Sequence, residues 1–297
     1  MNRRWLIIVN SAAGRRGSPL QRVSDAVVGQ RLDARIVETS SLDQLDAAVA
    51  SAVEEGITAF ASVGGDGSSH HLLNAMRRHG ETGPRQLLAI IPAGSGSDFA
   101  RMFGHRHGDI EAAIGRMGDP DLYPTDIGFV TGSFGERYFL NGIDVGVIAT
   151  SALKAESLPR WLGGLKYGLA LWLALWSFRG GTADVRVDHH RFTGDALTVV
   201  SANGQFFGGG FNIAPKATVV DGDLDVQVIH GPKRVAFTIM PRALRGAHLT
   251  HTAVRRYVGS EVSISVPDHW HVEADGEILG TGSVEISCLP GAIDYVL

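Results

Sequence analysis

Short apolar runs alternate with helical patterns through the first third of the chain. The apolar runs cover residues 6–9, 34–39, 57–63 and 87–91, and the helical patterns cover residues 19–30, 42–55, the stretch from 71 onward and 99–103. Strands that alternate with helices form a parallel sheet with helices on both faces, so we expect a three-layer α/β/α domain. In such a sheet, ligands bind at the carboxyl ends of the strands.

The pattern changes after residue 125. The next apolar segments are short, several of them alternate polar and apolar positions, and they cover residues 138–141, 183–187, 196–200, 224–229 and 262–266. A period of two predicts strands of an antiparallel sheet. We therefore predict two domains, 1–125 and 126–286, with the tail 287–297 as a candidate addition to the first.

One helical block interrupts these predicted strands. Residues 162–178 are almost wholly apolar around Lys166 and include Trp172 and Trp176. A bilayer span needs about 20 apolar residues, so this shorter block with an internal lysine predicts a packed or interfacial helix. Such a helix either lines an apolar pocket or dips into the bilayer interface.

A glycine-rich turn follows the third apolar run. Gly64, Gly65 and Gly67 surround Asp66 and precede Ser68. Glycines let the backbone approach an anion closely, and the following helix offers unpaired amides and the positive end of its dipole. Phosphate would repel the Asp66 carboxylate unless it caps the helix, orients a donor or acts through a divalent cation. The turn predicts a phosphate-binding loop, with an ordinary glycine-rich connection as the alternative.

Composition narrows the class of protein. The chain has 297 residues, of which 44% are hydrophobic and 20% are charged, as is typical of a soluble globular protein. A formal net charge of −4 argues against a general nucleic-acid binder. The single cysteine, Cys288, excludes a disulfide framework and favours a reduced cytoplasmic setting. The apolar run at 6–9 is too short for a signal peptide, so none is expected.

Three motifs together resemble the catalytic family of diacylglycerol kinases. They are Gly-Gly-Asp-Gly-Ser at 64–68, Pro-Ala-Gly-Ser-Gly-Ser-Asp-Phe-Ala-Arg at 92–101 and Asp-Gly-Glu at 275–277. That family includes bacterial lipid kinases, sphingosine kinases and ceramide kinases, and the resemblance covers essentially the whole chain. It implies a Rossmann-like nucleotide-binding domain of the NAD kinase and diacylglycerol kinase type and a C-terminal antiparallel β-sandwich domain. A cleft between them would hold ATP, Mg²⁺ and the lipid hydroxyl.

The resemblance also implies roles for individual positions. Glu277 matches the family's general base on the acceptor hydroxyl, and a residue of an ordinary hairpin turn is the alternative. Asp66 is the second catalytic candidate, because with Asp126 it could organise Mg²⁺; Asp126 as a turn residue is the alternative. The implied nucleotide-binding residues are Asn10, Gly14, Thr39, Gly64, Gly65, Asp66, Gly67, Ser68, Ser69, His70 and Ser95. The implied ligands of a structural Mg²⁺ are Thr218, Asp221 and Asp223, with a solvated Asp-Gly turn as the alternative.

Some positions depart from the family's pattern. Ser68 and Ser95 stand in place of threonines and Ser97 in place of an asparagine. Serine keeps the hydroxyl, so the phosphate contacts should survive. His70 and His71 stand where relatives have an asparagine and an acidic residue, and we expect them to be solvated or to cap the helix.

Together these features predict an ATP- and Mg²⁺-dependent lipid kinase that transfers the γ-phosphate to a lipid hydroxyl. Diacylglycerol is the default acceptor, and ceramide or a sphingoid base is the main alternative. A second alternative is a kinase for a soluble acceptor, because NAD kinases also carry the turn at 64–67. A third alternative is a catalytically weak regulator that binds lipid or nucleotide. We expect ATP, a lipid alcohol and, transiently, the inner face of the membrane as partners and no nucleic acid; a homodimer is left open.

Overall fold

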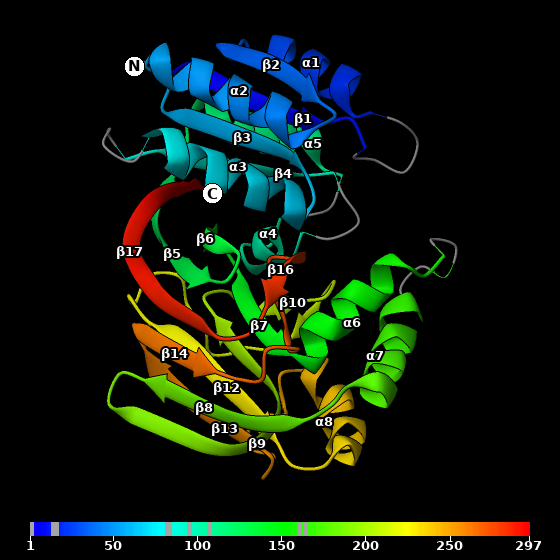
Figure 1. The fold of residues 1–297 in the computed structure, drawn as a ribbon. Helices are drawn as coiled ribbons and strands as arrows, with labels where there is room; N and C mark the ends of the chain where they lie inside the picture. The colour runs from blue at the N-terminus through cyan, green and yellow to red at the C-terminus, as the bar shows by residue number, and fades with distance from the viewer. Residues whose placement is uncertain are drawn as a thin grey trace. The chain divides into compact units, whose positions relative to one another are not determined.

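The computed structural model describes residues 3–12, 18–80, 85–93, 97–105, 108–159, 162 and 165–297 (Figure 1). The chain folds into two compact units. The first comprises residues 1–126 and 291–297, and the second comprises residues 127–290. Strand β17 (Val284–Val296), red in Figure 1, runs from the second unit into the first. The last seven residues therefore complete the unit that the first 126 begin.

A parallel sheet forms the centre of the first unit. Besides the end of β17, its strands are β1 (Trp5–Asn10), β2 (Ala34–Thr39), β3 (Ala59–Gly64) and β4 (Leu87–Pro92). Hydrogen bonds order them β2-β1-β3-β4, and β17 joins parallel to β4, with Tyr295 opposite Leu88. Every residue of β3 and β4 is buried, as expected for strands covered on both faces.

Helices cover the two faces of this sheet (Figure 1). They are α1 (Leu20–Gly29), α2 (Leu42–Glu54), α3 (Asp66–Gly80), the short α4 (Asp98–Met102) and α5 (Ile110–Gly118). The apolar sides of α1 and α5 share one core with Trp5, Ile7 and Val9 of β1, while α2 and α3 lie together on the other face. Alternate residues of β1 thus serve opposite layers, which is the three-layer arrangement that the sequence pattern predicts.

Antiparallel strands build the second unit. They are β5 (Leu122–Gly132), which begins in the first unit, β6 (Gly135–Phe139), β7 (Gly142–Gly146), β8 (Gly181–Val187), β9 (His190–Ala202), β10 (Phe206–Phe207), β11 (Phe211–Asn212), β12 (Leu224–His230), β13 (Val254–Gly259), β14 (Glu261–Ser265), β15 (His271–Ala274) and β16 (Glu277–Thr281). The long strand β9 pairs with β7, β8 and β12, and β14 joins β8 to β17. Apolar residues from these strands meet in one core that includes the fully buried Trp270.

Helices of the second unit lie beside this sheet. They are α6 (Val147–Glu156), α7 (Leu165–Ser177), the 3-10 turn η2 (Lys233–Val235) and α8 (Ala236–Ala243). Helix α7 corresponds to the apolar block at 162–178, and its Ala174 and Leu175 pack into the core of the strands. Within the described residues, no helix is long and apolar enough to span a bilayer.

One boundary differs from the sequence pattern in a way that affects the site. The apolar periodicity suggests a helix from His71, but α3 starts at Asp66, directly after Gly65. Glycine and serine add no apolar periodicity to the first turn of α3, so its start is invisible to the pattern. The glycine-rich motif is therefore shared between the end of β3 and the first turn of a helix.

Candidate active site

The first turn of α3 is the centre of the candidate nucleotide site. Only Gly65 separates β3 from α3, so the amide groups of the helix start lie at the carboxyl end of a central strand. A Cβ atom on Gly64 would lie 2.3 Å from Ser68 Oγ and 2.6 Å from Ser68 Cβ, so glycine is required beneath this side chain. The Ser69 hydroxyl lies 3.3 Å from Ser62 Oγ and ties the turn back to β3. This is the geometry in which a helix N-terminus binds phosphate.

Hydrogen bonds connect the segments that follow β1, β2, β3 and β4 at this edge of the sheet. Asn10 Nδ2, at the end of β1, donates to Ser68 Oγ at 3.0 Å. The Thr39 carbonyl, at the end of β2, accepts from the Ser11 amide at 3.0 Å. The Asp98 amide donates to Asp66 Oδ1 at 2.8 Å, which connects the loop after β4 to the start of α3. The structure thus brings together Asn10, Thr39, Asp66 and Ser68 as the sequence predicts.

Asp66 has a structural task in addition to any chemical one. Of the three roles that would reconcile a carboxylate with a phosphate-binding turn, its bond to the Asp98 amide is that of orienting a donor. Asp98 is itself buried, and its Oδ1 accepts from Arg101 Nε at 3.4 Å. Two carboxylates at a phosphate-binding edge form a donor set of hard oxygens, which suits Mg²⁺ that also binds phosphate oxygens.

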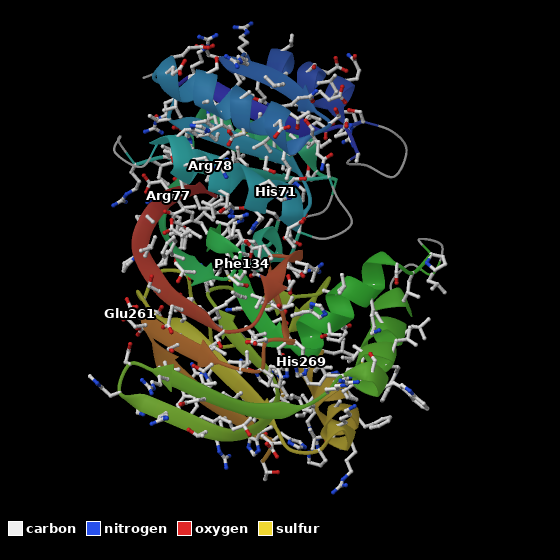
Figure 2. All side chains as sticks on the ribbon, in the orientation of Figure 1. His71, Arg77, Arg78, Phe134, Glu261 and His269 are labelled. Carbon is white, nitrogen blue, oxygen red and sulfur yellow. The ribbon has the colours of Figure 1, made fainter. Side chains whose placement is uncertain are left out.

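The histidines after the turn correct an expectation. His70 is only 2% exposed, and its carbonyl accepts from Asn74 Nδ2 at 2.9 Å. Its ring stands edge-on to that of His71, with 5.5 Å between centroids. The expectation of a solvated His70 is wrong, because α3 already includes this position, and His70 lies three residues before Leu73 on the buried face of the helix. Figure 2 shows His71 near the start of α3 and Arg78 toward its other end.

Other predicted residues of the first unit are placed as follows. Asp126 is buried, and its Oδ1 accepts from the Gly291 amide at 2.7 Å, which fastens the returning tail to β5. The bond to Gly291 does not test whether Asp126 binds Mg²⁺, so that role stays a prediction. Gly14 and Ser95 lie outside the described residues.

The second unit presents Glu277 on a tight hairpin. Strands β15 and β16 are joined by Asp275 and Gly276, with φ angles of +51° and +92°. Positive φ at both turn residues is the type I′ geometry that Asp-Gly favours. Glu277 is the first residue of β16 rather than a turn residue, so its side chain projects from an ordered strand.

A clamp of backbone amides fixes this hairpin. Asp275 Oδ1 accepts from the amides of Asn141 at 2.8 Å and Gly142 at 3.2 Å, and Oδ2 accepts from Leu140 at 2.8 Å. Bonds from several amides to one carboxylate are strong and directional. On the next strand, a Cβ atom on Gly280 would lie 3.0 Å from a ring carbon of Phe134 (Figure 2), so this ring packs closely on β16.

Two buried carboxyl groups lie next to the hairpin. Asp144 on β7 is directly opposite Glu273 on β15, and the two residues are 1% and 8% exposed. Burial raises the pKa of both carboxyls, and the nearby charge of Asp144 raises the pKa of Glu273 further. Glu273 Oε1 also accepts from the Gly276 amide. Glu273 therefore links a buried pair to the turn that precedes Glu277.

The suggested structural Mg²⁺ loop lies between β11 and β12. Asp221 is exposed, its Oδ1 accepts from the Asp223 amide at 3.2 Å, and Gly222 between them has φ +77°. The second oxygen of Asp221, the Thr218 hydroxyl and nearby carbonyls are donors of the kind that Mg²⁺ accepts. In the part of the chain that the structure describes, no three His, Cys, Asp or Glu side chains are grouped for a metal ion. Any Mg²⁺ here would therefore keep several waters.

Several residues of the site were not singled out from the sequence. Asp98 and Asp275 lie within the recognised motifs, but their bonds to Asp66 and to the 140–142 amides connect segments far apart in the chain. An Asp-Gly pair between two short strand patterns is a hairpin signal that could have assigned Asp275 its place. Asp144 and Glu273 carry no local signal, because only the strand register brings them together.

Comparison with known proteins agrees with this geometry. Residues 4–130 match the diacylglycerol kinase catalytic domain, and residues 141–297 match the YegS C-terminal NAD kinase beta sandwich-like domain. The fold and the matches define an enzyme that transfers phosphate to an alcohol group. The chain belongs to the diacylglycerol kinase and YegS family of lipid kinases. Both the resemblance drawn from three motifs and the predicted fold class are thereby confirmed.

The relatives share low sequence identity with this chain, but the similarity extends over most of its length. The chain is 25% identical over 270 residues to "Probable lipid kinase YegS-like" of Shewanella frigidimarina, covering 91% of this chain and 85% of that protein. It is 27% identical over 221 residues to "Diacylglycerol kinase" of Bacillus subtilis, covering 74% and 71%. A diacylglycerol kinase crystal structure from Bacillus anthracis superposes with a TM-score of 0.72 at 18% identity, covering 99% of this chain and 96% of that one. That structure supports the fold.

Proposed function

We propose that this protein transfers the γ-phosphate of ATP, in the presence of Mg²⁺, to the hydroxyl of a membrane lipid, with diacylglycerol as the default acceptor. The single observation that carries the proposal is the joining of the Asn10, Gly64–Ser69 and Asp98 loops at one edge of the parallel sheet. Phosphoryl transfer depends mainly on positioning and on neutralising charge, and this edge supplies amides and carboxylates for both.

The chain's own residues divide the work. The amides at the start of α3 hold phosphate oxygens, and Asn10 keeps the Ser68 hydroxyl in place beside them. Bound Mg²⁺ would neutralise charge on the phosphates, held by Asp66 with Asp126 as a further candidate. Glu277, on its clamped hairpin, accepts the proton of the lipid hydroxyl as that oxygen attacks.

The loop at 218–223 takes a structural role in this proposal. Mg²⁺ bound by Asp221, with Thr218 and Asp223 nearby, would order the exposed segment before β12. Ordering of this segment would raise the stability of the second unit without entering the chemical step.

The lipid acceptor implies a place of action. A lipid alcohol resides in a membrane, so we propose that the protein works in the cytoplasm and contacts the inner face of the membrane transiently. The names of relatives favour a glycerolipid acceptor. The experiment described next distinguishes this acceptor from three alternatives: ceramide or a sphingoid base, a soluble acceptor, and binding without phosphate transfer.

The test is transfer of label from γ-labelled ATP to a detergent-micelle panel of diacylglycerol, ceramide, sphingosine and phosphatidylglycerol. We expect Mg²⁺-dependent labelling of one lipid class, with diacylglycerol as the default. Loss of the general base should lower the rate at least about 100-fold in Glu277→Gln. Glu261→Gln is the matched control, because Glu261 is also the first residue of a strand in the second unit but is exposed (Figure 2).

Each other outcome has a definite meaning. Full activity in Glu277→Gln would remove Glu277 as the base and leave the kinase proposal intact. Labelling of ceramide or sphingosine alone would replace diacylglycerol as the acceptor. ATP binding without transfer to any lipid would contradict the proposed reaction and favour a soluble acceptor or a regulatory protein.

A further inference from the structure

From Leu169 to Trp176, helix α7 carries apolar side chains on its buried face and on its exposed face. Its covered face consists of the buried Ala170, Ala174 and Leu175, followed by Phe178, and the last three belong to the core of the second unit. Its outer face consists of Leu169, Trp172, Leu173 and Trp176, which follow the spacing of one helix face. Trp176 is 90% exposed. This exposure also excludes a pocket-lining role for Trp176 within its own unit.

Helix α8 extends this apolar surface. Its Phe237 ring lies 4.1 Å from the Trp172 ring, between centroids, so the two helices are neighbours on the surface. Phe237 is 61% exposed, and Leu244 just after α8 is 54% exposed. We call the exposed side chains of Leu169, Trp172, Leu173, Trp176, Phe237 and Leu244 the α7–α8 face.

The position of the end of α7 is fixed by its neighbours. Lys233 Nζ donates to the Trp176 carbonyl at 3.4 Å, and His269 Nε2 (Figure 2) donates to the Arg179 carbonyl at 3.0 Å. The Trp176 carbonyl belongs to the last turn of α7, and the Arg179 carbonyl follows two residues after the helix ends. The exposed tryptophan is therefore presented by an anchored helix end.

The charged residues of the two segments that carry this face are of one sign. Residues 157–183 and 231–260, which contain α7 and α8, include no Asp or Glu, although the whole chain has a net charge of −4. The exposed basic residues that accompany the two helices are Arg179, Lys233, Arg234, Arg242 and Arg245. A local excess of guanidinium and ammonium groups on an acidic protein favours an anionic partner.

An anionic bilayer meets both properties of the α7–α8 face. Tryptophan and phenylalanine bury well at the boundary between headgroups and acyl chains, while basic side chains reach the headgroup phosphates. A second copy of this chain would place the same basic residues against each other in a two-fold contact, which is unfavourable.

We propose that the α7–α8 face docks on anionic lipid bilayers, with Trp176 and Phe237 inserted at the interface and the flanking basic residues on the headgroups. The proposal rests on the proposed function in one respect, since a membrane is where a lipid acceptor is found. It adds the surface that makes the contact and the lipid charge that this surface selects.

The test is flotation of the full-length protein with vesicles in the absence of ATP. Vesicles of phosphatidylglycerol mixed with phosphatidylcholine should bind the protein at least about tenfold more tightly than phosphatidylcholine alone, and added salt should weaken the binding. Trp176→Ala and Phe237→Ser should each lower binding several-fold. Arg242→Gln combined with Arg245→Gln should remove the preference for anionic vesicles.

Val28→Ser is the matched control, because Val28 is 76% exposed on α1 in the other unit, and it should bind like the wild type. A loss in Val28→Ser equal to that in Trp176→Ala would overturn the proposal. So would equal binding to neutral and anionic vesicles, an absence of binding to either, or a protein dimer that Trp176→Ala dissociates.

A second readout separates this proposal from the proposed function. Transfer to a soluble short-chain diacylglycerol needs no bilayer, so Trp176→Ala should retain it while losing vesicle binding. Anionic vesicle binding without any kinase activity would leave the docking proposal standing and remove the proposed function. Kinase activity on the short-chain lipid without vesicle binding would support the proposed function and contradict the docking proposal.

Discussion

Asp144 and Glu273 face each other across antiparallel strands, and Glu273 also holds the amide of Gly276 in the turn before Glu277. Burial makes it costly for both carboxyls to ionise, and the charge of Asp144 raises the pKa of Glu273 further, so we expect the folded protein to retain a proton that the unfolded chain has released. The hairpin that carries the proposed base therefore adjoins a buried carboxyl pair with raised pKa values.

Stability should fall as pH rises through the range in which this pair ionises. The folded state keeps protons that the unfolded chain, with ordinary carboxyl pKa values near 4, has already released. The stabilisation is complete below about pH 4 and is lost as pH rises through the raised pKa values, and each pKa unit is worth about 1.4 kcal/mol. Glu273→Gln keeps a donor for Asp144 but has no proton to lose, so its unfolding midpoint in urea should depend less on pH.

The exposed Glu261 supplies the control for that measurement. Glu261→Gln should leave the pH dependence of the urea midpoint as it is in the wild type. Equal flattening of the curve in both variants would mean that the buried pair is not its source.

Asp275→Asn should keep the backbone conformation of the hairpin turn while weakening the hydrogen bonds that Asp275 accepts. Asp275 has φ +51°, which asparagine also tolerates, but an amide offers one acceptor oxygen where the carboxylate offers two. We expect Asp275→Asn to fold, to lose about 1–3 kcal/mol of stability and to lose lipid transfer at least about tenfold. ATP affinity should stay unchanged, since the nucleotide residues lie in the other unit. A parallel loss of ATP affinity would show general unfolding.

A methyl group at position 64 should damage the nucleotide site directly. In Gly64→Ala the new Cβ atom would overlap both Oγ and Cβ of Ser68, so the first turn of α3 would have to shift. We expect ATP affinity to fall at least about tenfold, measured with a fluorescent nucleotide. Gly29→Ala on α1 is the control, because its Cβ atom would meet nothing within 4 Å, and it should bind ATP normally. Normal ATP binding by Gly64→Ala would contradict the assignment of this turn.

Asp66 offers a way to separate structure from chemistry. Asp66→Asn keeps an oxygen for the Asp98 amide but removes the charge, while Asp66→Ala removes both. If the carboxylate helps to hold Mg²⁺, Asp66→Asn should melt within a few degrees of the wild type yet lose transfer about 100-fold. Asp66→Ala should lose both stability and transfer. Wild-type activity in Asp66→Asn would limit this residue to its structural bond.

The first unit could be predicted closely because its signals are local. The strands at 6–9, 34–39 and 87–91 and the helices at 19–30 and 42–55 agree with the structure within one or two residues. For β1 and β4 the reason is burial on both faces, which leaves clear apolar runs. Asn10 and Ser68, both predicted to bind nucleotide, are joined by a hydrogen bond, and their role stays a prediction. The start of α3 was misplaced because glycine and serine carry no periodic signal.

The second unit was harder to predict from the sequence, for physical reasons. Its strands were recognised where polar and apolar positions alternate, as in 183–187, but short strands such as β15 and β16 were missed, as were helices α6 and α8. In the first unit, α5 was missed as well. The pair Asp144 and Glu273 depends on the register of strands 129 positions apart, which no local pattern encodes. Buried acidic residues inside strands also contradict the usual alternation, so the pattern hides them.

The path of β17 affects how the chain is made. Its last residues pair with β4, whose residues are all buried, and a ribosome releases them only after the second unit has been synthesised. Until then β4 is an open, apolar strand edge, the kind of surface on which other chains add strands. Newly made protein should therefore be most prone to aggregate before its final seven residues emerge, and a chaperone that covers this edge would act at that stage.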